Sequence, residues 1–338
     1  MSEKFNVVMA IKPGLPEKLL NESMWKRLHE IANIEQHTEI TDFSDPAALE
    51  RMKDADYLWY GWEAPQVTAE ALNNMPKLKG IIAAQGVAYK GLSEEARKIA
   101  KERGIFATNV QAANSIPVAE YCLGVALLES KDYTLSQHQY GEQRAYINRE
   151  VNYADAGTYG KTIGIVTATA QIARDFMEML KPFDFNVIAW SRHLTDEEAA
   201  QYGAKKVDLD TVFRESDIVS IHTPGIPQTA NMIGEHELGL MKDGALLLNS
   251  ARGIVIDHKA LEKELVSGRI RAVLDVTDPE EPLPADSPLW DLPNVVLTPH
   301  IAGSMGCDLN RMGASVLTEF EHIAAGEPPV HFEANPLD

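Results

Sequence analysis

The chain has 338 residues, which corresponds to about two domains of typical size. Apolar residues make up 45% and charged residues 24% of the chain, a balance typical of a globular protein that excludes a disordered or collagen-like one. Asp and Glu number 50 against 31 for Lys and Arg, which gives a net charge of −19. Because so negative a surface repels phosphate backbones and anionic lipids, we expect no nucleic acid and no membrane as partner.

The remaining composition favours a cytoplasmic protein. The first five residues lack the basic and then apolar layout of a secretory signal. Uninterrupted apolar runs are far shorter than the roughly 20 residues that span a bilayer. The two cysteines, Cys122 and Cys307, cannot build a disulfide framework and lack metal-ligand spacing, so we expect no metal site.

The first third of the chain alternates apolar runs with amphipathic stretches. The patterns predict strands at 5–10, 57–60, 78–84 and 105–107, and helices at 16–32, 68–75, 93–103 and 115–128. Strands and helices that alternate at this spacing indicate βαβ units and a parallel sheet.

A second series follows a polar, tyrosine-rich segment at 131–156, which we expect to be a loop or a short exposed helix. The predicted strands are 163–166, 187–190, 218–221, 245–248, 272–276 and 295–297, with helices near 170–180, 195–202, 235–241, 257–267 and 305–325. Six strands with crossover helices is the count of a doubly wound dinucleotide-binding sheet.

The turn after the strand at 163–166 is where such a sheet holds a pyrophosphate. A G-x-G-x-x-G pattern is expected there, because glycines let the backbone approach the phosphates at a helix N-terminus. Here Ala168, Ala170 and Ala173 form A-x-A-x-x-A. The methyl group of Ala170 would crowd a phosphate, so a plain βα connection that binds nothing is the alternative interpretation.

The next strand ends where an acidic residue usually binds the ribose. This chain has Ser191 and Arg192 instead. Serine removes the carboxylate that would repel a 2′-phosphate, and the guanidinium of Arg192 can pair with that phosphate. The pair favours NADP(H) over NAD(H), and a solvated surface arginine is the alternative.

Three later segments place charged side chains directly after predicted strands: Arg252 in 248–253, carboxylates in 273–282, and His300 in 297–303. Open α/β sheets bind ligands outside the carboxyl ends of their strands. An arginine, a glutamate and a histidine fit hydride transfer to a 2-oxo acid. Arg252 would bind the substrate carboxylate, His300 would exchange a proton with the substrate oxygen, and the glutamate would orient the imidazole.

The segments 249–253, 274–282 and 298–303 resemble the signatures of the D-isomer-specific 2-hydroxyacid dehydrogenase family, as do 107–110, 118–121 and 220–224. The resemblance covers most of the chain from Tyr57 to about residue 325, and it gives Arg252 and His300 their catalytic roles. The acid is ambiguous, because Glu280-Glu281-Pro282 carries one residue more than the family's usual Pro-Glu-Pro. We favour Glu280 and keep Glu281 open.

The resemblance also implies an architecture and a set of contacts. It implies two Rossmann-like or flavodoxin-like α/β domains with doubly wound parallel sheets and an active-site cleft between them. Residues 1–110 with 305–338 would bind the substrate, and residues 111–304 would bind the dinucleotide. The long helix from Ser115 would pair two subunits into a homodimer. The backbone amides of Val87 and Ala88 would hold the substrate carboxylate, and the cofactor would contact Ala170, Gln171, Ile172, Ser191, Arg192, Thr223, Pro224, Ser250, Ala251, Asp275 and Gly303.

These observations predict an NAD(P)-dependent oxidoreductase that interconverts a small 2-oxo acid, such as glyoxylate or hydroxypyruvate, and a D-2-hydroxy acid. One alternative is a catalytically impaired relative that acts in regulation or partner binding, which the glycine-free turn favours. A second is oxidation of formate or phosphite, which Glu280 disfavours because the formate enzymes of this superfamily carry glutamine there.

Overall fold

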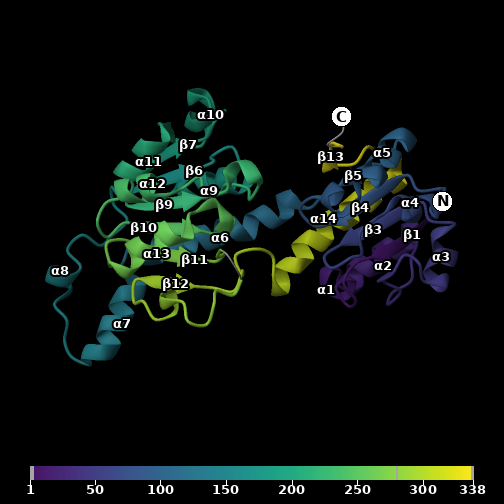
Figure 1. Ribbon diagram of the computed structural model, residues 1–338. Helices are drawn as coiled ribbons and strands as arrows, with labels where there is room; N and C mark the ends of the chain where they lie inside the picture. Colours follow the sequence, from purple (N-terminus) through teal and green to yellow (C-terminus); the bar gives the residue numbers. More distant parts are fainter. Residues whose placement is uncertain (1–3, 279–280, 336–338) are drawn as a thin grey trace. The chain divides into compact units, whose positions relative to one another are not determined.

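The computed structural model describes residues 4–278 and 281–335. The chain divides into two compact units, one formed by residues up to Asn114 together with those from Ser304 onward, and the other by Ser115–Gly303. Figure 1 shows the first unit in purple to blue with the yellow C-terminal part, and the second in teal and green. Both units are α/β, each built on one largely or wholly parallel sheet.

The first unit contains a six-stranded sheet in the order β13-β5-β4-β3-β1-β2. All neighbours are parallel except β13, which pairs antiparallel with β5. The strands are β1 Phe5–Ala10, β2 Ala32–Asn33, β3 Tyr57–Gly61, β4 Gly80–Ala84, β5 Phe106–Thr108 and β13 Phe332–Glu333. The chain leaves the sheet after residue 108 and returns near its end to add the edge strand.

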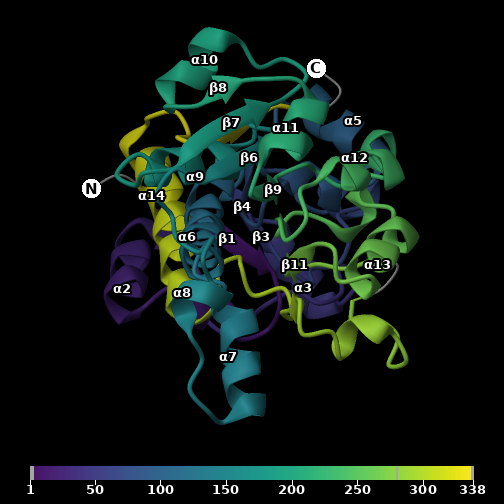
Figure 2. The same cartoon turned by 90° about the vertical axis from the view of Figure 1, so that its left-hand side faces the viewer.

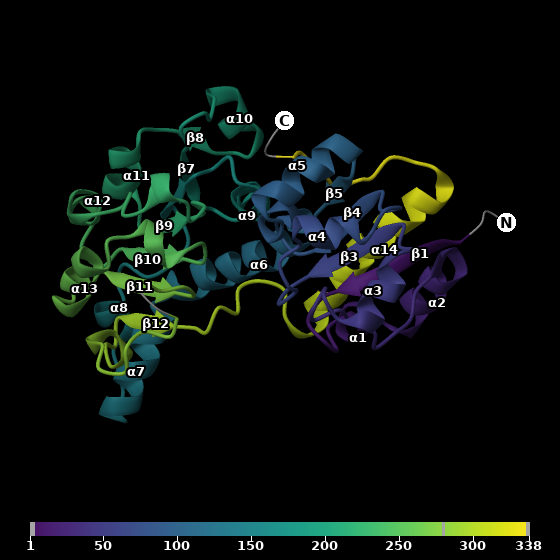
Figure 3. The same ribbon diagram turned by 45° about the vertical axis from the view of Figure 1, so that its right-hand side comes forward.

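Helices cover both faces of this sheet, and the central strands β3 and β4 are therefore buried along their whole length. Trp59 and Phe320 lie in the core on the face covered by α2 and α14, and Met52 and Leu72 lie on the face covered by α3, α4 and α5. Figure 3 shows α14 along β3 and β4. The helices are α1 Pro16–Leu19, α2 Glu22–Ile31, α3 Pro46–Met52, α4 Ala69–Asn73, α5 Glu94–Arg103 and α14 Leu309–Ala325, with 3₁₀ turns η1 Ala88–Gly91 and η5 Gly306–Asp308.

The second unit contains a seven-stranded parallel sheet in the order β12-β11-β10-β9-β6-β7-β8. The strand order reverses between β6 and β9, and a crevice at such a switch point is where doubly wound sheets bind ligands. The strands are β6 Thr162–Val166, β7 Asn186–Trp190, β8 Lys205–Lys206, β9 Ile218–Ile221, β10 Leu246–Asn249, β11 Arg271–Leu274 and β12 Val295–Leu297.

The helices of this unit pack on the two faces of the sheet, apart from two that extend away from it. Figure 2 shows α7 extending beyond the other helices of the unit, and Figure 1 shows α8 at its outer edge. The helices are α6 Gln111–Glu129, α7 Tyr133–Gln143, α8 Arg149–Asn152, α9 Gln171–Leu180, α10 Asp196–Gln201, α11 Leu209–Glu215, α12 Glu235–Leu240 and α13 His258–Val266, with 3₁₀ turns η2 Pro227–Thr229, η3 Gly253–Val255 and η4 Pro288–Trp290. No helix in the described part of the chain is both long and apolar enough to cross a membrane.

Three local predictions were wrong. The single helix expected at 16–32 is two helices, because Leu20 is extended and the side chain of Asn21 accepts a hydrogen bond from Met24 N to start α2. Helix α6 begins at Gln111, four residues before the predicted start. The two-residue strands β2, β8 and β13 and the short helices α3 and α11 were not predicted, because elements of a few residues carry too little periodic pattern.

Candidate functional site

Three loops lie side by side at the carboxyl ends of β10, β11 and β12. The amide of Asp275 donates to the carbonyl of Asn249 at 3.0 Å, and the amide of His300 donates to the carbonyl of Asp275 at 3.1 Å. Asp275 is the first residue after β11, and His300 is the third residue after β12, so the two bonds link the loops just beyond the ends of the paired strands. The structure thus brings the loop that carries Arg252, the loop that follows β11, and the loop that carries His300 to one edge of the sheet.

His300 is paired with a carboxylate. Its Nδ1 lies 2.9 Å from Oε2 of Glu281, and the two side chains are 47% and 41% exposed. An ionised carboxylate only accepts hydrogen bonds, so Nδ1 carries the hydrogen and Nε2 is free of this pairing. Glu280, which we favoured from the sequence, lies outside the described residues. The backbone of His300 has a φ of 55°, a left-handed conformation that is strained for a residue with a side chain.

Asp275 holds this strained loop in place. Its side chain is buried, with 1% exposure. Oδ1 accepts from the hydroxyl of Thr298 at 2.6 Å and from Ile301 N at 2.7 Å, and Oδ2 accepts from Ala302 N at 2.9 Å. The carboxylate therefore ties down residues on both sides of His300. Three hydrogen bonds to one buried carboxylate make Asp275 a rigid anchor for the loop that carries His300.

The guanidinium of Arg252 is exposed and has no acidic partner among the described residues. Its Nη1 donates to the carbonyl of Ala251 at 2.5 Å, which bends the side chain back over its own loop. A Cβ on Gly225 would lie 2.8 Å from Cγ of Arg252, so only glycine leaves room for the stem of this arginine. An unpaired guanidinium beside the His300 loop is suited to bind an anionic substrate.

The turn between β6 and α9 lies at the switch point of the sheet. Thr167 has a φ of 64°, so a threonine adopts the left-handed conformation that glycine usually supplies. Its hydroxyl lies 2.6 Å from that of Thr223, after β9, and the hydroxyl of Thr169 lies 2.8 Å from that of Ser191, after β7. Side chains at the carboxyl ends of three neighbouring strands therefore brace this turn.

The start of α9 fits a dinucleotide phosphate. Ala170 supplies no side-chain cap, and the amides of Gln171, Ile172 and Ala173 have no hydrogen-bond partner among the described residues. Uncapped amides at the N-terminus of a ten-residue helix attract a phosphate. Arg192 is exposed and likewise without a described partner, so its guanidinium is available beyond the end of β7.

Comparison with known proteins identifies the family of the chain. The sequence profile described as D-isomer specific 2-hydroxyacid dehydrogenase, NAD binding domain, matches residues 124–302. The chain belongs to the D-isomer specific 2-hydroxyacid dehydrogenase family. It is 35% identical to a glyoxylate reductase of Thermococcus litoralis over 88% of this chain and 91% of that protein.

Other relatives of this dehydrogenase family are longer than the chain. A D-3-phosphoglycerate dehydrogenase of Methanocaldococcus jannaschii is 33% identical over 91% of this chain, which spans 56% of that relative's length. A second such relative, from Archaeoglobus fulgidus, is matched over 48% of its own length. Among solved structures, a D-isomer specific 2-hydroxyacid dehydrogenase from Lactobacillus delbrueckii in an NAD complexed form superimposes with a TM-score of 0.79 at 23% identity, covering 97% of this chain and 100% of that one. This last likeness establishes the shared dehydrogenase fold.

Several residues that the dehydrogenase signatures assign to the cofactor have other contacts in this chain. The hydroxyl of Ser250 lies 3.3 Å from Sγ of Cys122 on α6. Asp275 directs both carboxylate oxygens to the His300 loop. Ala251 and Gly303 are half-buried and Pro224 is exposed. Burial raises the pKa of Cys122 to about 11, so this thiol stays protonated at neutral pH and is no nucleophile.

His222, after β9, is chemically unlike His300. Its ring is buried against Phe176, with Nε2 3.0 Å from the hydroxyl of Ser220. Burial lowers the pKa of His222 to about 3, so the imidazole is neutral at physiological pH. Of the two histidines that follow β9 and β12, only His300 combines an exposed ring with a carboxylate partner.

The predicted substrate loop lies in the other unit of the chain, after β4. The amides of Ala88 and Tyr89, in η1, donate to the carboxylate of Glu333 at 2.9 and 3.1 Å. The amide of Val87 has no partner among the described residues. The sequence patterns did not indicate Glu333, because it lies outside every family motif and 245 positions from Ala88.

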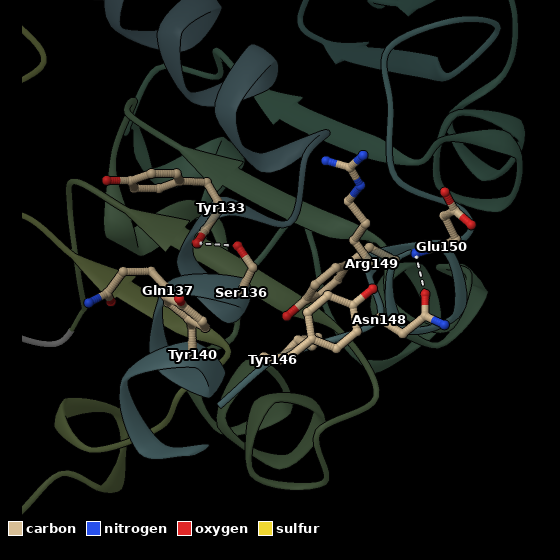
Figure 4. Close-up of a pocket in the computed structure, with 10 residues that line it drawn as sticks. Tyr133, Ser136, Gln137, Tyr140, Tyr146, Asn148, Arg149 and Glu150 are labelled. Carbon is tan, nitrogen blue, oxygen red and sulfur yellow. Dashed lines mark hydrogen bonds between the residues drawn. The ribbon is translucent and has the colours of Figure 1, made fainter. Parts of the chain in front are cut away.

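A tyrosine-rich groove of about 660 Å³ lies on the projecting helices α7 and α8 and the segment between them. Figure 4 shows Tyr133, Tyr140 and Tyr146 around it, with Arg149 and Glu150 at one side. The three tyrosines are 53%, 64% and 88% exposed. Large aromatic side chains exposed together are typical of a surface that another protein covers.

Proposed function

We propose that the chain is an NAD(P)-dependent oxidoreductase that interconverts a small 2-oxo acid and the corresponding D-2-hydroxy acid. The observation that carries this proposal is the His300–Glu281 pair, 2.9 Å apart, on the same sheet edge as the unpaired guanidinium of Arg252. Reduction of a carbonyl next to a carboxylate requires a proton donor for the carbonyl oxygen and a group that binds the anion, and an imidazole and a guanidinium can fill these two roles. The relative named glyoxylate reductase supports a small substrate.

In this mechanism Arg252 binds the substrate carboxylate through its planar guanidinium and polarises the adjacent carbonyl. Nε2 of His300 gives a proton to the carbonyl oxygen during reduction and takes it back during oxidation. Glu281 accepts from Nδ1 and so fixes the ring's tautomer and orientation. A bound nicotinamide supplies or accepts the hydride.

The residues that would hold the dinucleotide are those at the switch point. The free amides of Gln171 and Ile172 would bind the pyrophosphate, beside Ala170, Thr223 and Pro224. Ser191 and Arg192 would face the ribose and favour NADP(H), since a serine and an arginine accommodate a 2′-phosphate that a carboxylate would repel.

We expect a panel of 2-oxo acids, including glyoxylate and hydroxypyruvate, to be reduced by the purified chain with NADPH and more slowly with NADH. Absorbance of the reduced coenzyme measures the rate, and fluorescence titration measures coenzyme affinity without a substrate. Micromolar coenzyme binding together with turnover would support the proposed oxidoreductase activity. Absence of binding to either coenzyme would contradict it and favour a regulatory protein on the same fold.

Arg192→Ala provides the control for coenzyme choice. Losing a charge-assisted contact worth about 1.5–3 kcal/mol is expected to raise KM for NADPH roughly 10- to 100-fold and to leave KM for NADH nearly unchanged. Arg214→Ala removes an exposed arginine of α11 that pairs with Asp210, and it should change neither value. An equal loss for both coenzymes in Arg192→Ala would refute the assignment of the 2′-phosphate contact.

We infer further that two copies of the chain pair through the tyrosine-rich groove and the adjoining α6. Leu128 on α6 and Val151 on α8 are 50% and 72% exposed, so the helices next to the groove in the chain add apolar area for a partner. Sedimentation of the chain should give a dimer, and Tyr140→Glu with Tyr146→Glu should give a monomer. A monomeric parent at micromolar concentration would contradict the pairing.

A further inference from the structure

The carboxylate of Glu333 reaches from the C-terminal strand to the turn that follows β4. Its Oε2 accepts from Ala88 N at 2.9 Å and lies 3.4 Å from Nδ2 of Asn109, and its Oε1 accepts from Tyr89 N at 3.1 Å. One carboxylate thus accepts hydrogen bonds from the first two backbone amides of η1. The turn is also held from the other side, where Nε of Arg97 donates to the carbonyl of Tyr89 at 2.9 Å.

A second carboxylate holds the strand that carries Glu333. Glu319 on α14 is 1% exposed. It accepts from the amides of Val330 and His331, both at 2.9 Å, and from Nδ1 of His331 at 2.7 Å. The amide of Asn109, after β5, donates to the carbonyl of His331 at 3.2 Å. A continuous set of bonds therefore runs from α14 through the C-terminal strand to the turn.

Burial of the Glu333 carboxylate carries a desolvation cost, which its hydrogen bonds offset. Burial raises the pKa of this carboxyl group, and the amides of Ala88 and Tyr89, the side chain of Asn109 and the charge of Lys90 oppose that shift. A partly buried carboxylate is stable only while its hydrogen bonds are made. The position of the turn and the charge of Glu333 therefore depend on each other.

We propose that Glu333 is a positioning residue that clamps the 86–89 turn, so that the amide of Val87 is presented to the substrate carboxylate while the amide of Ala88 is held by the protein. This inference rests on the proposed function, because the turn acts on a substrate only if the chain reduces a 2-oxo acid. It also refines the expectation that Val87 and Ala88 share the substrate carboxylate, since the Ala88 amide already has an acceptor.

Glu333→Gln tests the clamp. Glutamine offers one acceptor oxygen, and its NH₂ group cannot accept, so one of the two amides loses its partner. We expect KM for the 2-oxo acid to rise on the order of 10-fold, with kcat within roughly 2-fold and the coenzyme Kd unchanged. Phe332→Ala is the matched control: it removes the 59%-exposed side chain preceding Glu333 and should leave KM unchanged.

Hydrogen exchange of the backbone gives a readout that needs no turnover. Peptides covering residues 86–89 should exchange on the order of 10-fold faster in Glu333→Gln than in the parent or in Phe332→Ala. Unchanged exchange overturns the clamp. Faster exchange with an unchanged KM overturns the positioning role. A parent that exchanges slowly at 86–89 but reduces no 2-oxo acid shows that the proposed function has failed, and the role toward substrate fails with it.

Discussion

Replacing His300 with asparagine is expected to lower kcat/KM for 2-oxo acid reduction about 10²- to 10⁴-fold, because the substrate oxygen loses its proton donor. Coenzyme affinity should change little, since the pyrophosphate would bind at the start of α9 and the His300 side chain is not among the residues assigned to the dinucleotide. Steady-state kinetics and fluorescence titration of the same preparation measure the two effects. Turnover within 3-fold of the parent would rule out His300 as the proton donor.

Substitutions of the two adjacent glutamates test which carboxylate orients His300. Glu281→Gln replaces the ionised acceptor of Nδ1 by a neutral one, and we expect kcat/KM to fall roughly 10- to 100-fold, the value of a charge-assisted bond. Glu280→Gln is the matched control in the same loop and should stay close to the parent. If Glu280→Gln has the larger effect, the family's acid lies at Glu280 and the observed pair is incidental to catalysis.

Asp275→Ala is expected to combine a large loss of stability with a loss of activity. The substitution leaves the amides of Ile301 and Ala302 and the hydroxyl of Thr298 without their buried acceptor. Each unsatisfied group costs about 1–3 kcal/mol, so the free energy of unfolding should fall by at least about 3 kcal/mol. Because the same bonds hold the left-handed backbone of His300, kcat should fall at least 10-fold in the fraction that remains folded.

Denaturant unfolding and active-fraction kinetics measure the two effects of this substitution. Asp275→Asn keeps one acceptor oxygen and should lie between Asp275→Ala and the parent. Asp278→Asn, three positions along the same loop, should change the free energy of unfolding by less than about 0.5 kcal/mol, because Asp278 has no hydrogen-bond partner among the described residues. A change below 1 kcal/mol for Asp275→Ala would show that the loop is held by other contacts.

Much of the candidate site could be predicted from the order of the strands. Arg252 and His300 directly follow buried runs, and the carboxyl ends of neighbouring parallel strands meet at one edge of a sheet. The sequence therefore predicted that these residues share an edge, before any distance was known. The role of Asp275 as anchor was not predictable, since it depends on loop amides that fold back onto the end of β11.

The sequence by itself determined the α/β class, the doubly wound second unit and the residue types at its strand ends. The reason is that the periodicity of apolar residues, and the order of strands and helices along the chain, can be read from the sequence without knowing any long-range contact. Only the tertiary structure shows that Glu281 lies within hydrogen-bond distance of His300, since the direction of a loop side chain depends on the dihedral angles of the whole loop. It alone also revealed that Glu333 holds the Ala88 amide, 245 positions away. Such a bond follows from where β13 joins the sheet, and a two-residue strand carries too little pattern for the sequence to place it.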